Sequence, residues 1–232
     1  MYVFGVIVAR GGSKGLPGKN IKLLGGLPLI AWSIQASKSS KLLSHTIVST
    51  EDSQIAQIAK QHGGLVPFLR PKELARDDSD LTDVVQHAVQ WLEDEKKIKP
   101  DVIVLLQATS PLRDPIDIDD TIQLLIVTGA DSAQTITEDR HHPLYRYYLD
   151  SEKRLSPLLK DIPHTTRRQD APAIYFPTGS VYVVTYKVLM EENSLRGKDQ
   201  RGLVRSFETS IDIDDIWDLR LAELILQHRK KS

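Results

Sequence analysis

The sequence of 232 residues contains no cysteine, almost no net charge and no long apolar run. The absence of cysteine excludes disulfides and thiolate metal sites. A formal net charge of −1 argues against general nucleic-acid binding, which needs a basic surface. No apolar run approaches the roughly 20 residues that a membrane-spanning helix requires. Residues 2–9 are apolar and lead directly into a glycine-rich stretch, so they indicate a buried strand rather than a signal peptide, and we expect a cytoplasmic protein.

The sequence does contain a regular alternation of short apolar segments and helix-like segments. Apolar or β-branched runs predict buried strands at Val3–Val8, Thr46–Ser49, Val102–Leu106, Ala133–Ile136, Val181–Val184 and Phe207–Ile213. Helical spacing and end signals predict helices at Leu29–Leu43, Ser53–His62, Thr82–Lys97, Asp117–Thr128 and Ile216–His228. This alternation predicts one α/β domain over residues 1–232, with a mainly parallel sheet.

The alternation stops between residues 138 and 175. This segment is polar, rich in proline and histidine, and contains Tyr145, Tyr147 and Tyr148. We interpret it as an excursion from the sheet rather than a second domain, and we expect it to form a dimerisation arm.

A glycine-rich, basic stretch follows the first predicted strand, 9-ARGGSKGLPGKN-20. Its glycines allow backbone N–H groups to approach phosphate oxygens, and Arg10, Lys14 and Lys19 supply positive charge. The stretch is not a Walker loop, because Ser13 replaces the first glycine and Asn20 follows the lysine. We therefore predict a phosphate-binding loop of another kind, with a solvated basic turn as the alternative.

Three further stretches place polar groups after predicted strands, where ligands bind in parallel α/β sheets. They are 70-RPKELARDDSD-80, 104-VLLQATSPLRD-114 and 211-IDIDD-215. In an extended segment, Asp212 and Asp214 share a face, and two carboxylates beside phosphates suit Mg²⁺. Helix capping is the alternative and accounts for Asp215, directly before the last helix, but not for the pair.

Taken in order, these stretches resemble the acylneuraminate cytidylyltransferases, the CMP-sialic acid synthetases and their relatives acting on legionaminate or pseudaminate. The matching segments are ARGGSKGLPGKNI, VSTED, RPKELARD, LLQATSPLR, RRQDAP and IDIDD, which together span most of the chain. The resemblance implies a three-layer nucleotidyltransferase fold, a Mg²⁺-dependent transfer from CTP to a sugar acid, and a homodimer whose arm at 138–175 contributes to the sugar site.

The resemblance also implies residue roles. Arg10, Lys19 and Asp214 would act in catalysis, and Asp212 and Asp214 would hold Mg²⁺. The nucleotide would contact Ser13, Lys14, Asn20, Arg70 and Ser79, and the sugar acid would contact Gln107, Thr109, Ser110, Arg168, Gln169 and Tyr182. No residue stands out as a general base.

Departures from the sialate-specific pattern fall on the sugar side. Tyr145 stands where those members tend to have lysine, Phe176 where they have arginine, and Thr178 where they have asparagine. We therefore predict that N-acetylneuraminate is not the best substrate. Two alternatives stay open: another sugar-acid or sugar-phosphate nucleotidyltransferase, such as a CMP-Kdo synthetase, and a nucleotide-binding switch module without transfer chemistry.

Overall fold

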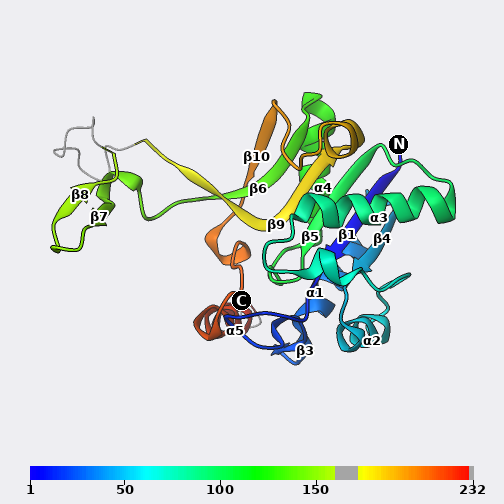
Figure 1. The fold of residues 1–232 in the computed structure, drawn as a ribbon, viewed down its shortest axis with the longest axis horizontal. Helices are drawn as coiled ribbons and strands as arrows, with labels where there is room; N and C mark the ends of the chain where they lie inside the picture. The colour runs from blue at the N-terminus through cyan, green and yellow to red at the C-terminus, as the bar shows by residue number, and fades with distance from the viewer. Residues whose placement is uncertain (160–171, 230–232) are drawn as a thin grey trace.

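The computed structural model describes residues 1–159 and 172–229, and a six-stranded sheet forms its centre (Figure 1). The strand order is β10 (Gln200–Val204), β6 (Ser132–Glu138), β9 (Tyr175–Thr185), β5 (Val102–Gln107), β1 (Val3–Val8) and β4 (His45–Ser49). β1 lies parallel to β4 and β5, and β10 lies parallel to β6. Only β9, between β5 and β6, runs antiparallel to its neighbours. The predicted mainly parallel sheet is confirmed.

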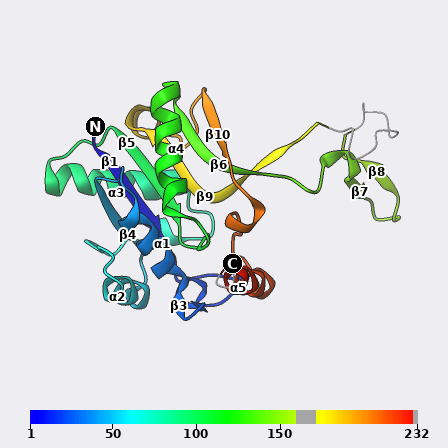
Figure 2. The ribbon, with the colours of Figure 1, turned by 180° about the vertical axis from the view of Figure 1, so that it is seen from behind.

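Helices cover both faces of this sheet. They are α1 (Leu29–Ser39), α2 (Ser53–Gln61), α3 (Leu81–Lys96) and α4 (Pro115–Thr128). The last helix, α5 (Ile216–Arg229), packs instead against Leu24 and the loop after β1. α3 crosses one face in Figure 1, and α1 and α4 cover the other face, seen in Figure 2. Successive side chains of a strand point to opposite faces, so Phe4 and Val6 pack in the cluster with α3, whereas Val3 and Ile7 pack in the cluster with α1 and α4. The three-layer α/β fold is confirmed.

Helix ends follow local capping chemistry. The Asp52 carboxylate accepts hydrogen bonds from the backbone N–H groups of Gln54 and Ile55, which begins α2. α1 ends at Ser39 rather than at the predicted Leu43. The reason is tertiary, because the Asp119 carboxylate of α4 binds the Ser40 hydroxyl and the next two backbone N–H groups, which turns the chain away.

The prediction of a strand at Phe207–Ile213 is wrong. This segment begins with the 3-10 helix η6 (Phe207–Thr209) and then runs extended without joining the sheet. Ile211 and Ile213 are buried against Leu219 of α5 and the loop after β1, so burial rather than strand pairing explains their apolar pattern. The edge strand beside β6 is instead β10. The sequence pattern did not predict β10, because most of its side chains are exposed.

The structure also contains shorter elements outside the central sheet and the helices α1–α5. They are β2 (Leu23–Leu24), β3 (Leu27–Pro28), the 3-10 helices η1 (Lys19–Ile21), η2 (Lys72–Ala75) and η3 (Pro143–Tyr145), and the π-helical turn η5 (Lys187–Glu191). Within residues 1–159 and 172–229, no helix is both long enough and apolar enough to cross a membrane.

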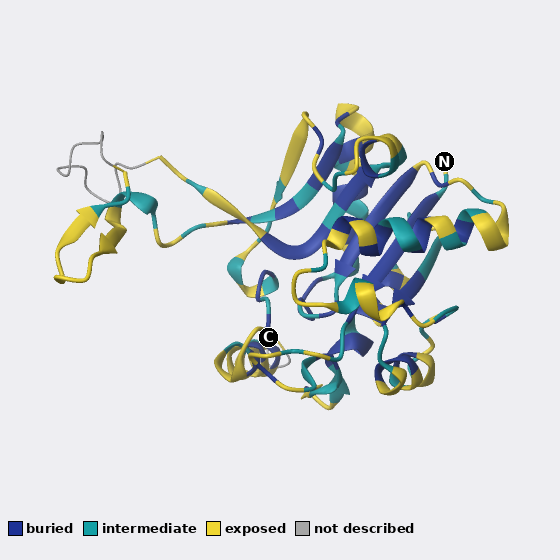
Figure 3. Cartoon of the chain, in the orientation of Figure 1, coloured by how far each residue is buried: buried dark blue, intermediate teal, exposed yellow. Residues whose placement is uncertain are grey.

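The segment after β6 leaves the body of the molecule as an arm. β6 and β9 continue their pairing to Glu138 and Tyr175, and a two-stranded sheet of β7 (Tyr147–Leu149) and β8 (Leu155–Pro157) lies beyond them. Figure 3 shows that β7 and β8 lie far from the central sheet and are exposed. The described part of this arm lies within residues 138–175, the segment predicted as an excursion.

Candidate active site

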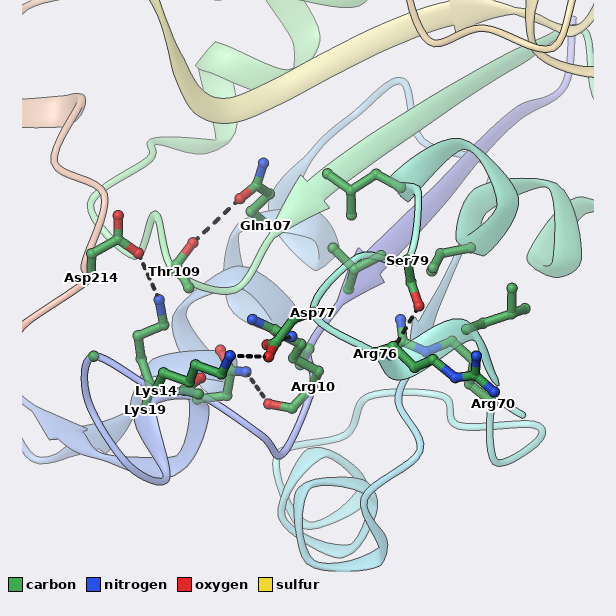
Figure 4. A pocket seen from close by; sticks show the side chains of 18 of the residues that line it. Arg10, Lys14, Lys19, Arg70, Arg76, Asp77, Ser79, Gln107, Thr109 and Asp214 are labelled. Atoms are coloured by element: carbon green, nitrogen blue, oxygen red, sulfur yellow. Dashed lines mark hydrogen bonds and ion pairs between the residues drawn. The ribbon is translucent and has the colours of Figure 1, made fainter. Parts of the chain in front are cut away.

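A pocket opens at the carboxyl ends of β1, β4 and β5, where the strand-to-helix loops meet (Figure 4). Its volume is about 490 Å³. The predicted site residues that line it are Arg10, Ser13, Lys14, Lys19, Asn20, Arg70, Ser79, Gln107, Thr109, Asp212 and Asp214. Stretches far apart in the sequence are therefore brought to one place by the sheet topology.

The loop after β1 brings three cations to this pocket. Arg10 Nη1 lies 2.6 Å from Asp77 Oδ1, and Lys14 Nζ lies 2.5 Å from Asp77 Oδ2. The hydrogen bonds from Lys14 and Arg10 lower the pKa of the Asp77 carboxyl group. The buried Asn20 amide donates to the Arg10 carbonyl oxygen at 2.9 Å and so fixes the loop from beneath. The loop presents a concentrated positive charge, as an anion site needs.

Two glycines of the loop are required by close approach of other segments. A Cβ atom at Gly11 would lie 2.4 Å from the Asp52 carboxylate, and one at Gly15 would lie 2.6 Å from the Asp214 carbonyl oxygen. The second contact is with backbone, which has little room to move. Gly15 therefore lets the loop lie directly against the segment that carries the aspartate pair.

Asp212 and Asp214 both line the pocket but differ in exposure. Asp214 is exposed and accepts a hydrogen bond from Lys19 Nζ at 2.9 Å. Asp212 is more buried; burial raises the pKa of its carboxyl group, the charge of Asp214 adds to this, and a hydrogen bond from Thr109 opposes it. Within the described residues no third His, Cys, Asp or Glu completes a metal-ligating cluster. Two carboxylates open to a pocket fit Mg²⁺, which takes its other ligands from phosphate and water.

The opposite end of the pocket carries Arg70 and Ser79 beside apolar side chains of Leu74, Leu81 and Val84. Figure 4 shows Arg70 and Ser79 at this end and Asp214 and Thr109 at the other, with Arg10 between them. An apolar wall with a few polar groups is typical of a pocket that binds a small molecule. The order along the pocket is thus the apolar end with Arg70 and Ser79, the cationic loop and the carboxylate pair.

A fully buried arginine holds the loop after β5 in place. Arg113 donates to the Gln107 carbonyl oxygen at 2.7 Å, to Ser33 Oγ at 2.9 Å and to Ser180 Oγ at 3.1 Å. Burial lowers its pKa to about 10, against the opposing effect of nearby carboxylates. This clamp ties the end of β5 to α1 and β9, and so positions Gln107 at the pocket edge.

Not every predicted residue faces the pocket. Ser110 is fully buried and its hydroxyl donates to Asp212 Oδ1 at 3.4 Å, so it lies behind the aspartate. Tyr182 packs partly buried in the core beside α3, and burial raises the pKa of its hydroxyl. Arg168 and Gln169 lie outside the described residues.

Sequence reasoning missed two polar residues of the pocket, Arg76 and Asp77. Both residues lie in the stretch 70–80, which the sequence indicates as a candidate site segment because of Arg70 and Ser79. The sequence pattern does not single out Arg76 or Asp77. The signal that could have found Asp77 is charge, since it is the acidic residue facing a loop with three cations.

Comparison with known proteins decides the family. Residues 4–180 match the sequence profile of the cytidylyltransferases. The chain belongs to this family. It is 35% identical over 235 residues to a Legionella pneumophila CMP-N,N′-diacetyllegionaminic acid synthase, an alignment that covers 100% of this chain and 99% of the relative. It is 30% identical over 227 residues to a Campylobacter jejuni pseudaminic acid cytidylyltransferase, covering 98% and 97% of the two chains. The nonulosonate cytidylyltransferase family predicted from the motifs is confirmed.

A solved structure supports the fold of this cytidylyltransferase. A CMP:2-keto-3-deoxy-manno-octonic acid synthetase complexed with CTP superimposes with a TM-score of 0.74 over 99% of this chain and 100% of the other. The two share 18% sequence identity, so the likeness concerns the fold alone.

Proposed function

We propose that this cytidylyltransferase activates a nonulosonic acid with CTP, giving a CMP-sugar and pyrophosphate. The observation that carries the proposal is the pocket itself, where an apolar end with Arg70 and Ser79, a cationic loop and a carboxylate pair follow one another. This order matches base, phosphates and metal in a nucleoside triphosphate, so we call the apolar end the ring-binding end. The names of the two relatives described above, a CMP-N,N′-diacetyllegionaminic acid synthase and a pseudaminic acid cytidylyltransferase, support the choice of CTP and of a nonulosonic acid.

In this proposal the cytosine lies at the end formed by Arg70 and Ser79, against Leu74 and Leu81. Ser13, Lys14 and Asn20 of the loop bind the triphosphate and ribose, and Arg10 and Lys19 contact the phosphates that change in the reaction. A planar guanidinium and an ammonium in a partly buried site neutralise developing charge more strongly than they would in water.

Asp212 and Asp214 would hold Mg²⁺ at the other end. The metal, when bound, supplies charge neutralisation beside the reacting phosphate oxygens. Lys19 already lies at Asp214, so this lysine and the metal ligand meet at one point of the pocket.

The chemistry is an in-line displacement. The anomeric hydroxyl oxygen of the 2-keto sugar forms a bond to the α-phosphorus and loses its proton to solvent water, while the bond to the bridging α–β oxygen breaks and pyrophosphate leaves. Negative charge increases on the phosphate oxygens, so cations fixed around them stabilise the transition state more than the ground state. Arg10 and Lys19 are the residues to which we assign this role.

Gln107 and Thr109, at the edge next to the carboxylate pair, would bind hydroxyl groups of the sugar acid, with Ser110 and Tyr182 supporting them from behind. Arg168 and Gln169 we assign to the sugar carboxylate by the family pattern. Because three positions depart from the sialate-specific pattern, we propose that the substrate is a nonulosonic acid other than N-acetylneuraminate.

We further propose that the arm at 138–175 pairs with a second copy of the chain and that the enzyme acts as a homodimer. Exposed apolar side chains support this assignment, among them Tyr147, Tyr148, Leu149 and Leu155, which are 49–66% exposed. Such a surface on a soluble chain normally contacts another surface. We place the reaction in the cytoplasm, because CTP is made there.

The test is pyrophosphate release from CTP with N-acetylneuraminate, legionaminate, pseudaminate, Kdn and Kdo, in the presence of Mg²⁺. We expect turnover with legionaminate or pseudaminate to exceed turnover with N-acetylneuraminate. Highest kcat/KM with Kdo would instead support a CMP-Kdo synthetase. Nucleotide hydrolysis that needs no sugar acid, with no CMP-sugar formed, would overturn the proposal in favour of a nucleotide-binding switch.

A further inference from the structure

Glu51 links two walls of the pocket from behind. It lies in the loop after β4 and does not line the pocket itself. Its Oε1 accepts a hydrogen bond from the Gly11 backbone N–H at 2.7 Å, and its Oε2 accepts one from Arg70 Nη2 at 2.8 Å. One carboxylate therefore connects the phosphate-binding loop with the arginine at the ring-binding end.

The Arg70 guanidinium depends on this contact. Its side chain is 3% exposed and that of Glu51 is 14% exposed. Within the described residues, the Nε–H of Arg70 has no acceptor. Burial lowers the pKa of Arg70, and Glu51 opposes that shift both by its charge and by its hydrogen bond. Glu51 is thus the group that pairs with this buried cation and fixes its direction.

A buried ion pair is a weak source of stability, because desolvation of both charges offsets their attraction. A geometric role accounts better for this one. Guanidinium groups are donors in a rigid planar fork, and their direction decides which acceptors they can reach.

We propose that Glu51 is a positioning residue that sets the discrimination between cytosine and uracil. The proposal rests on the proposed function, in which Arg70 lies beside the base. Cytosine presents acceptors at N3 and O2, whereas uracil presents a donor at N3, so a fixed guanidinium matches cytosine and opposes uracil. Polar groups held in one direction reject a mismatched base because the buried donor is then left unpaired.

The same carboxylate also binds Gly11, so the position of the base-reading arginine is tied to that of the phosphate loop. A base that moves Arg70 therefore also disturbs the loop that holds the triphosphate. We expect this link to appear in both KM and kcat, rather than in KM alone.

The experiment compares kcat/KM for CTP and for UTP, with a saturating sugar acid, in the full-length protein. Glu51→Gln keeps an acceptor for Gly11 but turns an amide N–H group toward Arg70. We expect the preference for CTP over UTP to fall about tenfold, the loss associated with one polar contact to a charged group. Glu51→Asp keeps the charge and should retain more of the preference than Glu51→Gln. Glu73→Gln, an exposed neutralisation in the neighbouring helix η2, is the matched control and should leave the preference unchanged.

A double-mutant cycle with Arg70→Gln tests whether Glu51 acts through Arg70. We expect Glu51→Gln to change base preference little once Arg70 is already replaced. If Glu51→Gln does not fold, the comparison of Glu51→Asp with wild type carries the test in the same way. An unchanged CTP-to-UTP ratio in the folded variants, with normal CTP use by wild type, would overturn this inference alone. Failure of wild type to use CTP would overturn the proposed function, and this inference with it.

Discussion

The pocket and the arm differ in the side chains that form their surfaces and in how far those side chains have partners within the chain. In the pocket, charged side chains are matched within the chain, since Asp77 pairs with Arg10 and Lys14, and Asp214 pairs with Lys19. In the arm, apolar side chains such as Tyr148 and Leu149 stand exposed on β7, with the central sheet far away (Figure 3). The pocket therefore has an ordered set of contacts in a single chain, whereas the arm has apolar surface that is exposed among the described residues.

This difference has a chemical consequence for ligand binding. An anionic ligand entering the pocket competes with carboxylates already present at the cations, so it exchanges one set of ion pairs for another. The net gain comes from multiple negative charges on one ligand, which suits a triphosphate better than a simple carboxylate. Binding to the arm involves no such exchange and depends on removal of apolar area from water.

The largest expected effect belongs to the loop cations. Arg10→Ala and Lys19→Ala should each lower kcat on the order of 10²–10³, the loss typical of one preorganised charged donor. Arg10→Lys should restore activity only in part, because an ammonium cannot reproduce the planar fork. Steady-state kinetics with CTP, together with thermal melts, measure this. Near-normal turnover in both folded alanine variants would show that the loop is only a solvated basic turn. The proposed functional difference between the pocket and the arm would then fail.

The carboxylate pair comes next. Asp214→Asn should lower kcat about 10²-fold and Asp212→Asn somewhat less, with a higher Mg²⁺ concentration needed for half-maximal rate. The control is Asp215→Asn. Asp215 Oδ1 accepts from the backbone N–H groups of Trp217 and Asp218, and asparagine caps a helix equally well. Equal damage in all three variants, or an unchanged Mg²⁺ dependence in Asp214→Asn, would contradict the metal assignment.

Charge placed on the arm tests its proposed partner. Tyr148→Glu combined with Leu149→Glu should convert a dimer to a monomer in light scattering, because burial of two large side chains contributes about 3–6 kcal/mol. We expect the KM for the sugar acid to rise about tenfold while the KM for CTP changes little. Val127→Glu, at a side chain of α4 that is 69% exposed, introduces one glutamate on the body and should leave the mass unchanged. A monomeric wild type would show that the arm serves another contact.

The smallest effect concerns the titration of His87 in α3, the helix that also brings Leu81 and Val84 to the pocket. Burial, and secondarily the charge of Arg70, lowers the pKa of His87 from its ordinary value of 6.5. The folded state then binds a proton less readily than the unfolded state, so stability is lost as the pH falls below about 6.5. Urea midpoints at about pH 7 and about pH 5 should differ less in His87→Gln than in wild type. His141→Gln, in the arm with an 81% exposed side chain, should retain the wild-type difference.

The sequence predicted the parallel core well because its strands are buried on both faces and therefore read as continuous apolar runs. It failed at β10, an exposed edge strand whose polar residues carry no such pattern, and at Phe207–Ile213, whose apolar residues pack beneath α5 instead of pairing. The spacing of apolar residues along a segment indicates that the segment is buried, but it does not show whether the segment is a strand of the sheet or packs beside the sheet.

The sequence predicted most of the residues that line the site, but not the directions in which their side chains point. Residues on the loops after β1 and β5 were placed correctly at one edge by strand topology alone. The sequence could not reveal that Ser110 points behind Asp212, or that Asp77 spans two cations from another loop. These depend on side-chain orientation and on packing between loops that are distant along the chain.

The place of β9 in the strand order has a consequence for how the chain folds. β1 pairs with both β4 and β5, but in this sheet β6 and β10 join them only through β9, which follows the whole arm in the sequence. Contacts between distant segments form slowly, because a long loop must close before they can stabilise the chain. Insertion of β9 is therefore expected to limit the folding rate. Until it occurs, the open edges of β5 and β6 are exposed to strands of other chains, so the yield of refolding should fall as protein concentration rises.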